Sequence, residues 1–178
     1  MTRIEWLEDG EARSARWRSE SGWPAPKKVV LADDTMSADA AYRLALDGTA
    51  LLWRGDFQNA RQLLQALVRR IEHKGERGRR AKAKAPAATP TEAFHRHRLG
   101  QLQRARLLAM LLIPFEADHG LLLRRAPDAR LACLEAYGPA DEPYVASLRE
   151  LLGVIGAHEW RRKGVMIPAL DGRIHPWY

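Results

Sequence analysis

A strongly basic segment near the middle of the sequence cannot take part in a hydrophobic core. Between Arg69 and Lys84 it has eight Lys or Arg against two Glu, and no large apolar residue follows Ile71 before Thr89. The other 162 residues carry 21 basic and 20 acidic groups, so this segment holds most of the formal net charge of +7. The segment is built largely from Lys, Arg, Gly, Ala and Pro, which supply too little apolar surface to form part of a core. We therefore predict a mobile basic linker at residues 72–89 that interrupts the folded part of the chain.

The basic linker has two interpretations. It can be a solvated connector, or it can tether RNA, DNA or an acidic partner by neutralising negative charge, which gives salt-sensitive binding without sequence preference. The candidate tether residues are Arg77, Arg79, Arg80, Lys82 and Lys84. No aromatic residue lies among these cations, so base stacking is not expected within the linker.

Apolar periodicity predicts one helix on each side of the linker. Apolar residues recur every three or four positions after Asn59, as in an amphipathic helix: Ala60, Leu63, Leu64, Leu67, Val68 and Ile71. Thr89, Pro90 and Glu92 form a capping-box start for a second helix, whose apolar face we expect to continue until Pro114. Because each apolar face needs a partner, we expect the two helices to pair across the linker.

Capping residues predict three further helices. Ser37 and its acidic neighbours precede a helix over 38–47, and Asp128 precedes one over 129–137. Ser147, with Glu150 three residues later, opens a helix that Gly164 ends. The short apolar segment 28–32 is expected to be extended.

The two ends of the chain differ from this helical middle. Residues 1–28 contain three tryptophans with weak periodicity, and we expect an irregular arm there. The Asp171-Gly172 turn predicts a β-hairpin over 165–178. The fold class is therefore predicted to be mainly α (α+β): a helical, bundle-like domain at 29–164, interrupted by the linker, with a short C-terminal β-hairpin.

Apolar patterning and cysteine content favour a cytoplasmic protein without membrane contact. The longest apolar run, from Leu107 to Pro114, has about eight residues, against the roughly 20 that a membrane-spanning helix requires. The N-terminus lacks the apolar core of a secretory signal. Cys133 is the single cysteine, so no internal disulfide can form and a reducing compartment is expected.

No complete catalytic, cofactor-binding or metal-ligating set is recognisable in the sequence. His158-Glu159 begins like a zinc motif, but Arg162 stands where the second histidine must be. Cys133 lies in an Ala-rich helix, where a buried apolar role is more common than a nucleophilic one. Gly-rich phosphate loops and serine elbows are also absent from the sequence.

Two polar and aromatic clusters remain as candidate contacts with a substrate or an anion. The first lies at a helix start and contributes Trp53, Arg54 and Asn59, although a tight turn at Gly55, with Asp56 as the helix cap, is the favoured explanation of this cluster. The second lies at a helix end, where the macrodipole also favours cations. It contributes His158, Arg161 and Arg162, together with His175 of the adjacent hairpin.

The same clusters carry a resemblance to a known family. The strings Gly48-Thr-Ala-Leu-Leu-Trp-Arg-Gly-Asp-Phe-Gln-Asn-Ala-Arg61 and Ala157-His-Glu-Trp-Arg-Arg-Lys-Gly164 resemble the N-terminal region of a bacterial family of class I S-adenosylmethionine-dependent methyltransferases. The segments 94–98, 167–170 and 173–176 are similar as well, so that the resemblance covers roughly residues 28–178. The basic linker and the first 27 residues carry none of it.

The resemblance implies a substrate-recognition domain that is inactive alone. In such families S-adenosylmethionine binds a Gly-rich loop of a doubly wound catalytic domain, and that loop has no counterpart here. The hairpin at 165–178 resembles the segment leading into that domain, so the expected partners are a C-terminal methyltransferase domain and a macromolecular acceptor, RNA or a translation protein. The alternative is a free-standing basic helical module that binds nucleic acid through residues 69–84.

Overall fold

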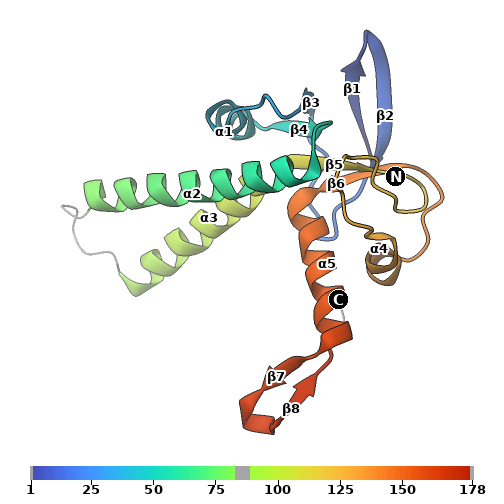
Figure 1. Cartoon of the computed structure of the whole chain (residues 1–178). Coiled ribbons are helices and arrows are strands. Elements are labelled where there is room, and N and C mark those ends of the chain that lie inside the picture. The colour runs from blue at the N-terminus through green and yellow to red at the C-terminus, as the bar shows by residue number, and fades with distance from the viewer. Residues whose placement is uncertain (1, 83–88, 177–178) are drawn as a thin grey trace.

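The computed structural model of the chain describes residues 2–82 and 89–176, and of residues 76–82 it describes the helical backbone alone. Within these residues the chain forms a six-stranded mixed sheet, a two-stranded sheet and five α-helices (Figure 1). The strands are β1 (Arg3–Glu8), β2 (Glu11–Trp17), β3 (Lys28–Ala32), β4 (Thr49–Trp53), β5 (Leu111–Phe115), β6 (Tyr144–Ser147), β7 (Val165–Ile167) and β8 (Gly172–Ile174). The helices are α1 (Ala38–Leu46), α2 (Phe57–Lys82), α3 (Pro90–Leu108), α4 (Arg130–Tyr137) and α5 (Leu148–Lys163).

The large sheet has the strand order β1-β2-β6-β5-β4-β3. Strands β3, β4 and β5 run parallel, as do β2 and β6, whereas the β1–β2 and β5–β6 pairs are antiparallel. The two edge strands, β1 and β3, also contact each other, so the sheet nearly closes on itself. This curvature gives the sheet an inner face and an outer face.

The helices cover one face of the sheet, whereas on the other face the strands of the curved sheet, β1 and β2 included, pack against one another. On β4, Leu51 and Trp53 join the core cluster shared with the helices, whereas Leu52 joins a second cluster with Ile4 of β1 and Ala15 of β2. Successive side chains of a strand point to opposite faces, so β4 is buried on both sides. The core therefore consists of two layers separated by the sheet.

The predicted helical, bundle-like fold is wrong, because the protein has an α/β fold built on a mixed sheet. The apolar segments that form β4 and β5 are almost entirely buried. A strand that is buried on both faces shows a continuous apolar run instead of an alternating pattern. For this reason the helix expected to reach Pro114 ends at Leu108, and residues 111–115 form a central strand.

The irregular N-terminal arm is likewise corrected, because β1 and β2 form a regular antiparallel hairpin at residues 3–17. Asp9 and Gly10 connect the strands, with φ angles of 53° and 80°. Two positive φ values are typical of the tight turn that an Asp-Gly pair favours between twisted strands. Residues 18–27, between β2 and β3, do lack regular secondary structure.

Helices α2 and α3 pair, as expected, and project together from the sheet (Figure 1). Arg104 of α3 forms an ion pair of 2.9 Å with Glu72 of α2, and Arg70 pairs with Asp39 of α1. The linker predicted at 72–89 is wrong for residues 72–82, because α2 continues to Lys82, and residues 83–88 of the predicted linker lie outside the described residues. Lys, Arg and Ala have high helix propensity, which favours the helix even without an apolar face to bury.

Several predicted helix starts are confirmed. The Ser37 side chain accepts a hydrogen bond from the Ala40 N–H, Thr89 and Glu92 form the capping box, and Ser147 accepts from the Glu150 N–H. The C-terminal hairpin is confirmed over residues 165–174, where β7 pairs with β8, and residues 177–178 of the predicted span lie outside the described residues. Both strands lie beyond the end of α5, away from the large sheet (Figure 1). Among the described residues, no helix has the combined length and hydropathy needed to cross a bilayer.

Candidate functional site

We call helices α2 and α3 together the α2–α3 arm, and the stretch of sequence that contains them, residues 57–108, concentrates the positive charge of the protein. It carries 13 Lys or Arg against three Asp or Glu, whereas the rest of the sequence has 16 basic and 19 acidic residues. This stretch therefore has a formal charge of +10 and the remainder −3. Arg69, Arg96 and Arg98 are exposed, and residues 89–103 are exposed throughout. Residues 57–75 and 89–108, whose side chains the structure describes, carry eight Lys or Arg against two Glu, a formal charge of +6. The described part of the arm is therefore cationic, whereas the rest of the protein is weakly anionic.

A groove lies at the base of this arm, where the end of α3 meets residues 17–28. It consists of two adjoining cavities of about 450 and 340 Å³ that share Trp17, Trp23 and Ala109 in their walls. Three cations line the larger cavity, namely Lys27, Lys28 and Arg106, together with a single carboxylate, Asp47. We call the two cavities together the Trp17–Trp23 groove.

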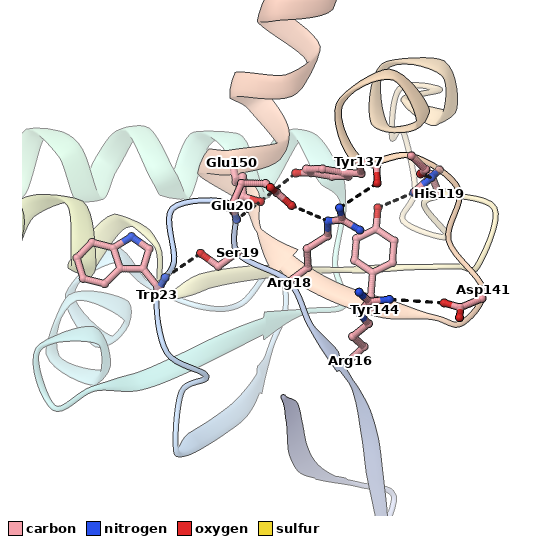
Figure 2. A network of polar contacts seen from close by, with 11 residues as sticks. Arg16, Arg18, Ser19, Glu20, Trp23, His119, Tyr137, Asp141, Tyr144 and Glu150 are labelled. Carbon is pink, nitrogen blue, oxygen red and sulfur yellow. Dashed lines mark hydrogen bonds and ion pairs between the residues drawn. The ribbon is translucent and has the colours of Figure 1, made fainter. Parts of the chain in front are cut away.

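The wall of the groove is held in place by hydrogen bonds within the segment after β2. The Trp17 indole N–H donates to the carbonyl oxygen of Trp23 at 2.8 Å. The main-chain N–H of Trp23 donates to Ser19 Oγ at 3.2 Å. Figure 2 shows Ser19 and Trp23 close to Glu20, whose backbone is bonded to α5. The segment therefore has fixed partners although it has no regular secondary structure.

Arg18 and Glu150 anchor this segment to α4 and α5 (Figure 2). Arg18 donates to Glu20 at 3.0 Å and to the carbonyl oxygen of Tyr137 at 3.1 Å, and its guanidinium lies 4.1 Å from the centre of the Tyr137 ring. The Glu150 carboxylate accepts from the Glu20 N–H at 3.2 Å and from the Tyr137 hydroxyl at 3.0 Å. Burial raises the pKa of Glu150, and these hydrogen bonds act against that rise.

A buried polar cluster behind this network is structural. Each ring nitrogen of His119 has one hydrogen-bond partner. Tyr144 Oη lies 2.9 Å from Nδ1, and the Gly138 carbonyl oxygen lies 2.9 Å from Nε2. Because a carbonyl only accepts, Nε2 carries the proton and, in the neutral ring, Nδ1 accepts from Tyr144. Burial raises the pKa of the Cys133 thiol to about 11 and also raises the pKa of Tyr144. A fully buried thiol with a raised pKa is a poor nucleophile.

The first predicted contact cluster is occupied with internal contacts. Trp53 is only 1% exposed and donates its indole N–H to the Asp56 carbonyl oxygen at 3.0 Å. Arg54 forms an ion pair of 2.6 Å with Glu8 of β1, and the Asn59 side chain donates to Asp34 at 3.0 Å. These contacts stabilise the loop between β4 and α2. They therefore favour a structural role for this cluster over contact with a substrate.

The structure brings the second predicted cluster together at the end of α5. His158 Nδ1 and Arg161 Nη1 contact Glu135 of α4 at 2.8 and 2.9 Å, and Arg162 contacts Glu159 at 3.5 Å. His175 donates from Nδ1 to the Arg161 carbonyl oxygen at 2.5 Å. The adjacent cavity has a volume of about 30 Å³, too small for a substrate.

The predicted tether residues fall on and beyond the end of α2. The backbone of Arg77, Arg79, Arg80 and Lys82 is helical, while their side chains and Lys84 lie outside the described residues. The sequence interpretation missed the Trp17–Trp23 groove. The sequence signal for this groove is the pair of tryptophans followed by Lys27-Lys28. This signal alone does not indicate a groove, because the end of α3 supplies the opposite wall.

The described residues contain no cluster of three or more His, Cys, Asp or Glu side chains that could hold a metal ion. No protein-family model matches the sequence, and no curated protein or solved structure matches it either.

Proposed function

We propose that this chain is the RNA-recognition domain of an S-adenosylmethionine-dependent methyltransferase and that the α2–α3 arm binds the RNA backbone. The observation that carries the proposal is the charge separation, with +10 on residues 57–108 and −3 on the remainder. Cations that neutralise phosphates release condensed counterions, which favours binding without base specificity. An anionic body repels the same strand, and so directs it to the arm. The arm charge favours RNA over a translation protein as the acceptor.

The methyltransferase part of the proposal rests on the resemblance of residues 28–178, and the cofactor fits a separate catalytic domain better than this chain. Gly55 follows strand β4, and a glycine that follows a strand can leave room for a bound ligand. A Cβ atom at Gly55 would lie 2.8 Å from the backbone nitrogen of Asp34, so this glycine serves close packing and does not cradle a ligand. We assign no residue of this chain to S-adenosylmethionine. We place the protein in the cytoplasm, where a single cysteine stays reduced.

Salt-dependent RNA binding tests the recognition function. The affinity for a fluorescent single-stranded RNA is measured by anisotropy across salt concentrations, for the unmodified chain and for the triple variant Arg69→Gln/Arg96→Gln/Arg98→Gln. Each lost phosphate contact is expected to reduce the slope of log K against log salt by about 0.7. The slope should therefore fall by up to about 2 in the triple variant.

A matched control removes the same charge elsewhere. Arg13, Arg43 and Lys163 are exposed and lie on β2, α1 and the end of α5, outside the arm. Their triple substitution by Gln should leave the slope nearly unchanged. Equal losses in the two triple variants would show that binding follows net charge alone and would contradict recognition by the arm.

Methyl transfer separates the proposed function from the free-standing module. The chain alone should transfer no methyl group from labelled S-adenosylmethionine to RNA. A longer protein with the chain followed by a catalytic domain should do so, and the arm variant should lower its activity mainly through a higher KM for RNA. Salt-dependent RNA binding without methyl transfer by any longer protein would support the free-standing module instead.

A further inference from the structure

We propose that the Trp17–Trp23 groove binds one unpaired nucleotide of the strand held by the α2–α3 arm, with the base against Trp23 and its phosphate near Lys27, Lys28 and Arg106. This inference deepens the proposed function and rests on it. It identifies the preferred substrate as single-stranded RNA, because a base in a duplex is stacked and paired and cannot enter a groove.

The Trp23 indole has the properties of an unused stacking surface. It is partly exposed, it lines both cavities of the groove, and its indole N–H, unlike its main-chain N–H, makes no hydrogen bond to another described residue. Trp17, by contrast, already uses its N–H in the bond to Trp23. Aromatic side chains that line a positively charged groove are the usual platform on which single-stranded bases stack. Trp23 therefore offers a π-face and a free donor to a base.

The charges around the groove match a phosphate. Lys27, Lys28 and Arg106 line the larger cavity, and none of them forms an ion pair with a described carboxylate. Asp47 is the single acidic residue in that wall. Unpaired cations beside an aromatic surface provide the two contacts that every nucleotide needs, one for the phosphate and one for the base.

The groove also has the size and position that the proposal requires. A cavity of about 450 Å³ lies within the usual range of 300–1,000 Å³ for small-molecule sites. Arg106 and Ala109, at the C-terminal end of α3, form part of its wall, so the groove is continuous with the arm. A strand that follows α3 toward the sheet would reach the groove next.

The test compares single-stranded and duplex RNA of about 12 nucleotides, a length that single-strand binders cover. Trp23→Ala should weaken binding of the single strand by about 5- to 150-fold and leave duplex binding unchanged. Trp160→Ala is the matched control, because Trp160 is 62% exposed on α5 and lies outside both cavities. It should change neither affinity. Trp23→Phe should restore most of the single-strand affinity, since a phenyl ring also stacks.

Three outcomes would overturn the inference. Unchanged single-strand affinity in Trp23→Ala would exclude stacking, and an equal loss for single strand and duplex would show that Trp23 acts through the fold. If Trp23→Ala does not fold, as judged by its thermal transition, the double variant Lys27→Gln/Lys28→Gln replaces it. Unchanged single-strand affinity in this double variant would contradict the phosphate contact and so the inference. Unchanged binding in the arm triple variant would instead refute the proposed function, so the two failures are distinguishable.

Discussion

The indole N–H of Trp17 is hydrogen-bonded to the main-chain carbonyl oxygen of Trp23 at 2.8 Å. The bond joins the last residue of β2 to a segment without regular secondary structure, and it sets both residues in the wall of one groove. Because the acceptor is a backbone atom, the bond does not depend on the side chain at position 23. The Trp23 ring is therefore available for a role other than holding this segment.

Trp17→Phe removes the donor of this bond while keeping an aromatic ring in the second core cluster. A typical intramolecular hydrogen bond contributes about 0.5–1.5 kcal/mol, so the free energy of unfolding should fall by about 1 kcal/mol. Urea denaturation followed by circular dichroism measures the change. Trp160→Phe, at an exposed site, is the control and should be neutral. Equal stabilities for Trp17→Phe and the unmodified chain would show that the bond contributes nothing.

Gly55 lies in close contact with Asp34. A Cβ atom there would lie 2.8 Å from both the backbone nitrogen and Cγ of Asp34, and the backbone cannot move aside as a side-chain end can. Gly55→Ala should therefore lower the free energy of unfolding by about 1–3 kcal/mol. Gly100→Ala is a control with the opposite sign. Gly100 has open space in α3, and Ala should stabilise that helix by about 1 kcal/mol. Thermal unfolding of both variants tests the contrast.

Local signals predicted the helix starts, whereas the sheet could not be predicted in the same way. Ser37, Thr89 and Ser147 cap helices through bonds to residues three positions away, so the signal is contained in a short string. Strand β5 pairs with β4 and β6, which lie far away in the sequence. Its continuous apolar run is compatible with a helix or a buried strand, and tertiary pairing decides between them.

The N-terminal hairpin could have been predicted, because its signals are local. Ile4 and Trp6 alternate with Arg3 and Glu5, and the Asp9-Gly10 turn follows directly. The Trp17–Trp23 groove, by contrast, requires residues 17–28 to lie beside the end of α3. No spacing rule connects segments so far apart, so the candidate site predicted from the sequence fell on Trp53 and His158 instead.

The Tyr144 hydroxyl is the partner of His119 in the buried polar cluster. Tyr144→Phe keeps the ring that stacks on Phe115 at 4.5 Å but leaves His119 Nδ1 without its 2.9 Å contact. An unsatisfied buried acceptor costs about 1–3 kcal/mol, and the free energy of unfolding should fall by that amount. Urea denaturation measures it. Tyr42→Phe is a control, because the Tyr42 hydroxyl makes no hydrogen bond to a described residue. A similar loss in both variants would contradict a specific role for the His119 contact.

Asp56 makes the stability of the protein depend on pH in the acid range. Hydrogen bonds from Arg125 at 2.6 Å, the Gln58 N–H at 2.8 Å and Arg124 at 3.0 Å hold its pKa at about 2, below the ordinary 3.8. The unfolded chain therefore binds more protons in this range, so the stabilisation is complete above about pH 4 and is lost as pH falls through about 2. In urea denaturation, the stability difference between the unmodified chain and Asp56→Asn should be constant at neutral pH and shrink toward pH 2. Asp171→Asn, on the exposed hairpin turn, should follow the unmodified profile. A difference for Asp56→Asn that stayed constant down to pH 2 would show that the carboxylate charge does not stabilise the fold.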